Sequence, residues 1–265
     1  MRLFDKLGFK WDRSAVSAGV SASVDRAIFR YKQMLVQFVF DASSLEGNPF
    51  TFPEVKTLLD GVTVGGHKLT DEQQVLNLAA AAKELFTLVK ERSFRLDKAT
   101  FDRLHALVAR EEPLEWGHFR GEGEFSDITP CVGLGYEGEF VPSHPTEPGA
   151  ENLKKLFSDA VQALETEVAD ARERALAFFL FGALQQFYFD GNKRTSRFMM
   201  NGVLMSHGFD AISVPAKRAQ EFNENMVRFY LGKDATEMMR FLIDCQPKNA
   251  PTRKPIQSPS SGQSM

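Results

Sequence analysis

One short polar stretch, flanked on both sides by strongly apolar helical runs, constrains this chain more than any other feature. It reads Phe-Tyr-Phe-Asp-Gly-Asn-Lys-Arg-Thr-Ser-Arg from Phe187 to Arg197. The run before it spans 174–186, and the run after it spans 198–207 and closes at Gly208. The Gly-Asn step therefore joins two helices. Because a helix begins with unpartnered backbone N–H groups and a partial positive charge, this step predicts an anion-binding point.

Three charged side chains surround this step. Arg194 and Arg197 are three residues apart at the start of the second helix, so they share a face and can both reach a bound anion. Asp190 precedes the turn, where a carboxylate beside a polyphosphate suits Mg²⁺. Together these residues describe a nucleotide-phosphate pocket. A second interpretation is equally open on chemistry alone, namely a polar helix-turn-helix corner in which Asp and Asn serve the turn.

Composition excludes several classes of protein. With 43% apolar residues, 25% charged residues and a net charge of −3, the chain has the make-up of a soluble globular protein and no basic field for nucleic acid. Cys131 and Cys245 lie far apart, without metal spacing, and fit a reducing cytosol. The most apolar run, 175–189, is interrupted by glutamines and is shorter than the about 18–20 residues that span a bilayer. We therefore expect a cytoplasmic protein that binds neither nucleic acid nor membrane.

Apolar residues that recur at three- and four-residue steps predict a mainly α-helical chain. An irregular lead-in is expected over 1–20, with Trp11 as a packing anchor. Thr51 and Glu54 form a predicted capping box. His105 falls on an apolar helix face and is expected to be a hydrogen-bonded core residue, because a lone histidine rarely forms a metal site. Helices are predicted at about 21–45, 51–59, 70–91, 97–108, 151–170, 174–186, 198–207, 216–231 and 234–245.

The segment 111–146 differs from the rest of the chain. It holds many glycines, four prolines and an alternating stretch over 132–141, which predicts a short hairpin or flap. After Gln246 the chain is rich in Pro, Ser, Lys and Gln, so the tail 246–265 is predicted to be disordered. The predicted fold class is mainly α, with one small β-hairpin.

The pattern around Asp190 resembles the motif of the Fic family, His-Pro-Phe-x-(Asp/Glu)-Gly-Asn-(Gly/Lys)-Arg-x-x-Arg, and matches it from Asp190 through Arg197. A second stretch, Ser43-Ser-Leu-Glu-Gly-Asn48, resembles the inhibitory-helix motif (Ser/Thr)-x-x-x-Glu-(Gly/Asn) of members that carry this helix N-terminal to the core. The strict Ser/Thr position falls on Ala42, one residue before Ser43. Two motifs in the right order make the resemblance specific, and it covers about residues 20–245.

The resemblance implies a Fic-like helical bundle. The N-terminal helices, including the inhibitory helix, would occupy 21–110, and a Fic core with flap and nucleotide-phosphate loop would occupy 111–245. In Fic enzymes Mg²⁺ and ATP sit at the Gly-Asn turn, and AMP is transferred to a hydroxyl group of a target protein. The flap over 132–141 would line up that protein target by strand-like pairing.

The resemblance also implies a role for each residue of the turn. Asp190 would hold Mg²⁺. Three residues would form the anion nest around the α- and β-phosphates, and Arg194 would reinforce it. These three are Gly191, Asn192 and Lys193.

The inhibitory motif implies a further contact. Arg197 would meet the γ-phosphate or, in the resting state, pair with Glu46. Such a pair occupies the cation that a γ-phosphate needs. It also gives a partner to Glu46, whose place near a helix end otherwise opposes the helix dipole.

One position departs from the family pattern. Gln186 stands where the family histidine acts as general base, and glutamine has no titratable proton. The loss of a general base typically costs about 10²–10⁴ in rate. Phosphoryl-type transfer, however, owes much of its acceleration to positioning and charge neutralisation. His207 lies at the far end of the next helix, about 15 Å from the start of that helix, and is not expected to substitute.

Three interpretations are open from the sequence. The first is a Fic-domain protein that binds Mg–ATP or a related nucleotide, is autoinhibited by Glu46, and has lost or much weakened AMP transfer. The second is an active protein adenylyltransferase, which would explain why an inhibitory glutamate is present. The third is a non-nucleotide interaction protein in which the arginines are structural. The selective loss of the one group that serves chemistry alone favours the first interpretation.

Overall fold

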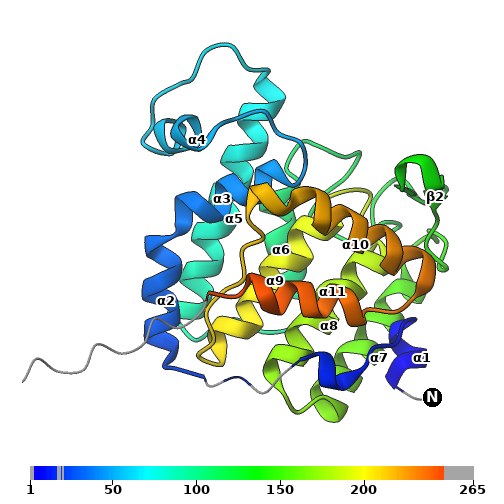
Figure 1. The fold of residues 1–265 in the computed structure, drawn as a ribbon. Coiled ribbons are helices and arrows are strands. Elements are labelled where there is room, and N and C mark those ends of the chain that lie inside the picture. The colour runs from blue at the N-terminus through cyan, green and yellow to red at the C-terminus, as the bar shows by residue number, and fades with distance from the viewer. Residues whose placement is uncertain (1–2, 17–18, 20, 248–265) are drawn as a thin grey trace, which may run out of the picture.

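The computed structural model describes residues 3–16, 19 and 21–247 of the chain. In this part the protein consists of α-helices, short 3-10 turns and one small antiparallel hairpin (Figure 1), so the predicted mainly α fold class is confirmed. In chain order the elements are α1 (Leu3–Leu7), α2 (Val24–Gln33), α3 (Leu35–Ser44), α4 (Phe52–Leu59), α5 (Leu69–Lys90), α6 (Lys98–Val108), β1 (Val132–Gly133), β2 (Glu139–Phe140), α7 (Glu151–Glu167), α8 (Ala171–Gln185), α9 (Asn192–Ser206), α10 (Ala219–Gly232) and α11 (Thr236–Cys245).

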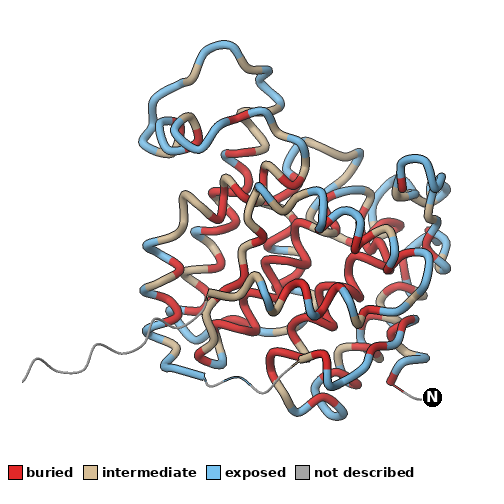
Figure 2. Tube along the Cα trace, viewed as in Figure 1, coloured by how far each residue is buried: buried red, intermediate tan, exposed pale blue. Residues whose placement is uncertain are grey.

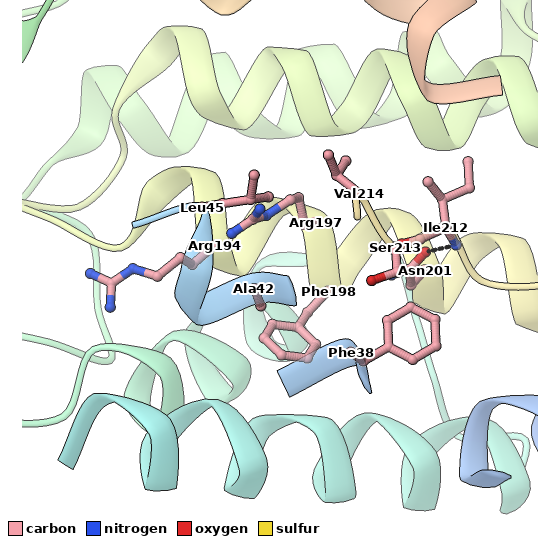
Figure 3. A pocket seen from close by; sticks show the side chains of 10 residues that line it. All are labelled: Phe38, Ala42, Leu45, Arg194, Arg197, Phe198, Asn201, Ile212, Ser213 and Val214. Carbon is pink, nitrogen blue, oxygen red and sulfur yellow. Dashed lines mark hydrogen bonds between the residues drawn. The ribbon is translucent and has the colours of Figure 1, made fainter. Parts of the chain in front are cut away.

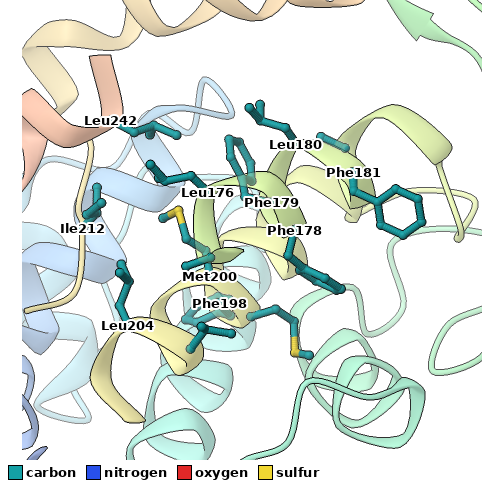
Figure 4. Close-up of a cluster of buried hydrophobic side chains, with 14 of the residues drawn as sticks. Leu176, Phe178, Phe179, Leu180, Phe181, Phe198, Met200, Leu204, Ile212 and Leu242 are labelled. Carbon is teal, nitrogen blue, oxygen red and sulfur yellow. The ribbon is translucent and has the colours of Figure 1, made fainter. Parts of the chain in front are cut away.

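Two adjacent helices, α8 and α9, form the centre of the molecule. From Ala175 to its end α8 is buried on every side, and α9 is buried from Arg194 to Met205. Figure 4 shows the large apolar side chains that fill the space around this pair, and Figure 2 shows the buried part of the chain running through the middle of the fold. The helices approach so closely that a Cβ at Gly182 would lie 2.1 Å from the Ser196 Oγ. This packing fixes the end of α8 and the start of α9, and therefore the turn between them.

The other helices surround the central pair. Helices α5 and α6 pack against α9, α7 packs against α8, and α3 packs against α5. The predicted capping box at the start of α4 is present, with the Thr51 N–H donating to Glu54 Oε2 at 2.7 Å. The predicted single helix over 21–45 is instead two helices, because the backbone leaves helical geometry at Met34 (φ −101°, ψ 8°).

The prediction of an irregular lead-in over 1–20 is wrong for much of the described part of this segment. Residues Leu3–Leu7 form α1, and a 3-10 turn spans Arg13–Ala15. Most apolar residues of the described segment are buried against the body of the protein, although Phe4 is 36% exposed. Trp11 is confirmed as a packing anchor, since it is 4% exposed and its Nε1 donates to Glu173 Oε1 at 2.8 Å. Burial of these side chains orders a segment whose sequence shows no helical period.

The predicted hairpin is confirmed, although it is short. Strands β1 and β2 pair antiparallel, with Val132 opposite Phe140 and Gly133 opposite Glu139, and a 3-10 turn over Gly135–Glu137 connects them. We call residues 132–141 the flap. From residue 248 onward the predicted disordered tail lies outside the described residues. None of the helices in the described ranges is both long and apolar enough to cross a membrane.

Candidate functional site

The turn between α8 and α9 is closed by the side chain of Asn192. Its Oδ1 accepts from the Tyr188 N–H at 2.9 Å, and its Nδ2 donates to the Tyr188 carbonyl at 2.7 Å and to Gln186 Oε1 at 3.0 Å. Left-handed residues bound the turn, with Gln186 (φ 50°) at the end of α8 and Gly191 (φ 73°) before α9. A Cβ at Gly191 would lie 3.0 Å from the Ala109 Cβ. Both the backbone conformation and the space therefore favour glycine there.

The side chain of His105 stabilises this turn through a hydrogen bond. The ring is fully buried, accepts the Gly117 N–H at Nδ1 (2.9 Å) and lies 2.9 Å from the Asp190 carbonyl through Nε2. Since a carbonyl only accepts, Nε2 carries the proton and the ring is neutral. Burial lowers the pKa of His105 to about 3, which agrees with this tautomer. The prediction of a hydrogen-bonded core histidine is confirmed.

Backbone N–H groups point from the start of α9 toward the surface of the turn. The helical hydrogen bonds of α9 begin with the Thr195 N–H, which donates to the Gly191 carbonyl at 2.9 Å. The N–H groups of Asn192, Lys193 and Arg194 precede that bond, so they have no acceptor within the helix. The Gly191 N–H donates to Asp190 Oδ1 at 2.6 Å, which removes one member of the predicted nest from the groups available to a ligand.

Two adjoining hollows open over the turn. The first, of about 230 Å³, is lined by Gln186 and by residues 189–194, with Glu46 and Cys131 on its other side. The second, of about 520 Å³, lies between the end of α3, the flap and α10. Both hollows share Glu46, Lys193 and the β1 residues, so they adjoin, and together we call them the groove. Its size lies within the about 300–1,000 Å³ of typical small-molecule sites.

Glu46 meets two of the three cations at this turn. Its Oε1 lies 3.2 Å from Arg197 Nη2, and its Oε2 lies 3.9 Å from Lys193 Nζ. Burial alone would raise the pKa of Glu46, but the charges of Lys193, Arg197 and Arg194 outweigh it and hold the pKa below its usual value. Arg197 is only 8% exposed and lines neither of the two hollows. Of the predicted site residues, it is the one that the groove does not reach.

Arg197 and Arg194 also line a small, partly open void between α3 and α9, shown in Figure 3. The void has a volume of about 30 Å³, enough for about one water molecule. Its other walls are mainly apolar side chains of Phe38, Leu45 and Val214. The helix that ends beside Glu46 is therefore not packed tightly against α9 at this point.

Arg194 is engaged by carboxylates on two sides. Its Nη1 donates to Glu112 Oε2, and its Nη2 lies 3.3 Å from Asp190 Oδ2. The Arg194 side chain is 4% exposed, and the same carboxylates with Glu46 raise its pKa above the ordinary value although burial opposes this. Glu112 was not predicted to take part in the site. It lies in a loop without periodicity, so nothing in the sequence marks it.

Asp190 is suited to a weakly held divalent cation. Its carboxylate is 61% exposed, and no cluster of three or more His, Cys, Asp or Glu side chains that would hold a metal occurs among the residues that the structure describes. Mg²⁺ typically keeps several waters and takes one or two carboxylates together with substrate phosphates. A single exposed carboxylate beside a turn with free backbone N–H groups fits that kind of site.

The Gln186 side chain is used within the protein. Its Nε2 donates to the Ala183 carbonyl at 2.6 Å, and its Oε1 accepts from Asn192. Gln186 is 6% exposed and offers no proton-accepting nitrogen to the groove. His207 bonds to the Val203 carbonyl and to Arg174 at the opposite end of α9, so it does not face the turn. His207 therefore does not supply a general base at the turn.

Arg120 is a buried cation that the sequence did not reveal. It is 0% exposed, and it contacts no carboxylate within the described residues. Its guanidinium donates to the Gln186 carbonyl at 2.6 Å, to Thr146 Oγ1 at 2.7 Å and to the His144 carbonyl at 2.7 Å. Burial lowers its pKa to about 10, so it stays charged at neutral pH. Arg120 thus joins the end of α8 to the chain that leaves the flap.

Sequence comparison finds similarity to relatives that share one name. It is 25% identical over 248 residues to "Protein adenylyltransferase Fic" of Culex quinquefasciatus, which covers 91% of this chain and 45% of the relative. It is 25% identical over 250 residues to the protein of the same name from Nematostella vectensis, covering 92% and 53%. The chain therefore spans about half the length of these curated relatives. No protein-family model matches it.

Structure comparison gives the same fold. Fic-1 from C. elegans superposes with a TM-score of 0.66 at 20% identity, covering 92% of this chain and 66% of that one. A Fic domain-containing signaling protein from Bacteroides thetaiotaomicron superposes with a TM-score of 0.64 at 16% identity, covering 91% and 87%. The helical arrangement described above is therefore that of solved Fic-domain structures.

Proposed function

We propose that this chain, a Fic-domain protein by its fold and its relatives, binds an Mg²⁺–nucleoside triphosphate, in the first instance ATP, in the groove over the turn. Glu46 holds Arg197 in the resting state and limits the binding of the terminal phosphate. Because Gln186 replaces the general base, transfer of AMP to a protein hydroxyl is lost or strongly reduced. The observation that carries this proposal is the Glu46–Arg197 pair at the mouth of an N–H-lined turn.

The charges around the turn favour a polyphosphate. Lys193, Arg194 and Arg197 gather at the start of α9, and the first N–H groups of that helix add a partial positive charge. Glu46 neutralises part of this charge. A γ-phosphate that displaces Glu46 would gain Arg197 as a partner in a buried setting, where charge-assisted hydrogen bonds are strong.

The second hollow supports a nucleoside rather than a free phosphate. It continues from the phosphate-binding turn and is lined by Asn223, Met226 and Tyr230 of α10 together with the flap. Apolar side chains beside a few hydrogen-bonding groups are the usual lining of a ligand site. A nucleobase would lie there while the phosphates lie over the turn.

The residues present assign roles for a transfer reaction as well as for binding. Asp190 would hold Mg²⁺, which when bound neutralises phosphate charge. Asn192, Lys193 and Arg194 would position the phosphates through their N–H groups and side chains. Gln186 would contribute a donor or acceptor only and move no proton. A partner protein would lie along the flap, whose β1 residues border both hollows.

An active adenylyltransferase is the second candidate. The intact Glu46–Arg197 pair favours it, because an inhibitory contact has little use in a protein with nothing to inhibit. Glu46 has a different use in the first candidate, where it gates nucleotide binding itself.

Titration calorimetry with Mg–ATP tests the binding proposal. We expect Glu46→Gly to bind about tenfold more tightly than the parent and Arg197→Ala about tenfold more weakly, each a change of about 1.4 kcal/mol. Glu91→Gly, which removes another carboxylate at a helix end, is the matched control and should leave the affinity unchanged. If neither the parent nor Glu46→Gly binds at about 1 mM, the proposal is wrong and the arginines are structural.

Label transfer from α-labelled ATP to protein separates the two candidates. Glu46→Gly is compared with the same variant carrying Gln186→His, in the presence of Mg²⁺ and cell extract. Transfer by Glu46→Gly alone supports the active enzyme. Transfer only by the histidine-restored protein supports a nucleotide-binding protein that has lost the reaction.

A further inference from the structure

The flap presents a surface whose chemistry identifies its partner. We propose that the flap, together with the chain at its root, docks an extended protein segment that combines Lys or Arg with apolar side chains. This inference rests on the proposed function only in placing a protein partner along the flap. It adds the chemical class of that partner.

The flap has open strand edges. Strands β1 and β2 pair with each other, and no third strand of the described chain pairs with either. An unpaired edge offers backbone N–H and C=O groups to another extended chain. In Figure 1 the flap stands at the periphery of the helical body, where such a chain can approach it.

Apolar side chains on and beside the flap are exposed. Tyr136 is fully exposed at the tip, Val141 is 58% exposed after β2, and Ile128 is 42% exposed before β1. Exposed aromatic and aliphatic residues beside a free strand edge are typical of a binding surface rather than of a solvated loop.

The exposed residues stand on an ordered base. Thr146 donates to the Ile128 carbonyl through Oγ1 and to Thr129 through its N–H, and Arg120 holds Thr146 from inside the protein. Phe140 packs on Tyr230 of α10 with ring centroids 5.0 Å apart. The flap is therefore attached at both ends, so little conformational entropy would be lost in ordering it when a partner binds.

The charged residues of this segment are all acidic, while Lys233, which follows α10, places its Nζ 3.7 Å from the centroid of the Phe140 ring. Between Arg120 and Lys154 the sequence contains seven acidic residues and no lysine or arginine, whereas the whole chain has a net charge of only −3. Four of these carboxylates run from the root of the flap to its tip, and all four are exposed without an ion pair to any described residue. They are Asp127, Glu137, Glu139 and Glu147.

These carboxylates do not form a metal site. The described residues contain no group of three or more candidate ligands. Carboxylates at the root of the flap, on β2 and in the turn at the tip instead give this surface a negative potential, which attracts and orients a positively charged chain. Side chains of alternate residues in an extended segment would face the apolar residues and the carboxylates of the flap.

Fluorescence anisotropy on the full chain in the presence of Mg–ATP tests the inference. The probe is a short labelled peptide in which Lys alternates with Val and Thr. The control peptide has the same sequence with Glu in place of each Lys. We expect the Lys peptide to bind at least about tenfold more tightly, with an affinity that falls as salt is added. Equal binding of the two peptides, or no binding of the Lys peptide at about 1 mM, would overturn the inference.

Variants locate the surface. Glu137→Lys with Glu139→Lys should weaken the Lys peptide about fivefold or more, and Tyr136→Ala should weaken both peptides. Glu165→Lys on α7, another exposed carboxylate without a described ion pair, is the control for net charge. An equal loss with Glu165→Lys would show that the flap is not the surface.

Calorimetry with Mg–ATP on the same proteins keeps the two proposals apart. Tyr136, Glu137 and Glu139 line neither hollow, so their variants should bind Mg–ATP like the parent. A parent that binds the Lys peptide but not Mg–ATP would remove the proposed function and leave the flap surface in place. A parent that binds Mg–ATP but not the Lys peptide would overturn the inference about the flap and leave the proposed function in place.

Discussion

Arg197 Nη2 and Glu46 Oε1 lie 3.2 Å apart although 151 residues separate them in the chain. The arginine lies on the second turn of α9, and the glutamate follows the end of α3. Neither side chain is well exposed, at 10% and 18%. The contact therefore joins the N-terminal helices to the central pair at the mouth of the groove, and it covers a cation that the groove would otherwise expose.

This pair should be energetically coupled. In a double-mutant cycle with Glu46→Gln and Arg197→Met, we expect a coupling energy of about 1–3 kcal/mol in urea denaturation, because each single variant leaves a poorly solvated partner. The exposed pair Lys155–Asp159 on α7 is the control and should give at most about 0.5 kcal/mol. Equal coupling energies in the two cycles would show that the Glu46–Arg197 pair is coupled no more strongly than an exposed ion pair.

Glu112 should restrain Arg194. Glu112→Gln removes one of its two carboxylate partners, so the guanidinium becomes available to a phosphate. We expect Mg–ATP affinity measured by calorimetry to rise about threefold or more. Glu111→Gln, at the neighbouring exposed position, should have no effect. Weaker binding in Glu112→Gln would instead mean that the carboxylate positions Arg194 for the ligand.

Arg120 should be needed for the geometry of the turn. Arg120→Met leaves the Gln186 and His144 carbonyls without a donor, and we expect a loss of about 2–4 kcal/mol in the free energy of unfolding. Arg120→Lys keeps the charge but reaches fewer oxygens, so it should restore only part of the stability and of the Mg–ATP affinity. Arg240→Met, on the exposed face of α11, is the control. A fully stable Arg120→Met would show that the buried charge has no role in the turn.

His105 should make the fold sensitive to mild acid. Its folded pKa, about 3, lies below the unfolded value of about 6.5. The folded state thus binds fewer protons than the unfolded state, so stability is full above about pH 6.5 and falls as the pH drops toward 3. Between about pH 6 and 4 the parent should lose about 1 kcal/mol per pH unit more than His105→Gln, measured by urea denaturation. Equal slopes would show that His105 is not buried in its neutral form.

Much of the fold and the turn was predictable from local pattern. The apolar runs on either side of Asp190–Arg197 placed the two central helices, and the Thr51–Glu54 spacing placed a capping box. His105 was predicted as a core residue from its helical period alone. These features depend on residues close together in the sequence, where period and capping chemistry act directly.

The parts that were not predictable depend on long-range contacts. The break at Met34 carries no Gly or Pro signal, and α1 is ordered by burial of a segment that lacks helical period. Glu112 and Arg120 lie in a loop, where their types alone do not distinguish a site residue from a solvated one. Their roles follow from α9 and the flap lying beside them, which no local pattern encodes.

The close approach of Gly182 to Ser196 decides which parts of the site are free to move. Helices α8 and α9 leave no room for a Cβ at Gly182, so they cannot slide or rotate against each other without a large cost in free energy. The turn between them is therefore rigid. Displacement is then confined to the walls of the groove, such as the end of α3, which borders the small void of Figure 3. Opening and closing would be motions of the walls, on the slower timescale of loops and helix ends, around a turn that stays in place.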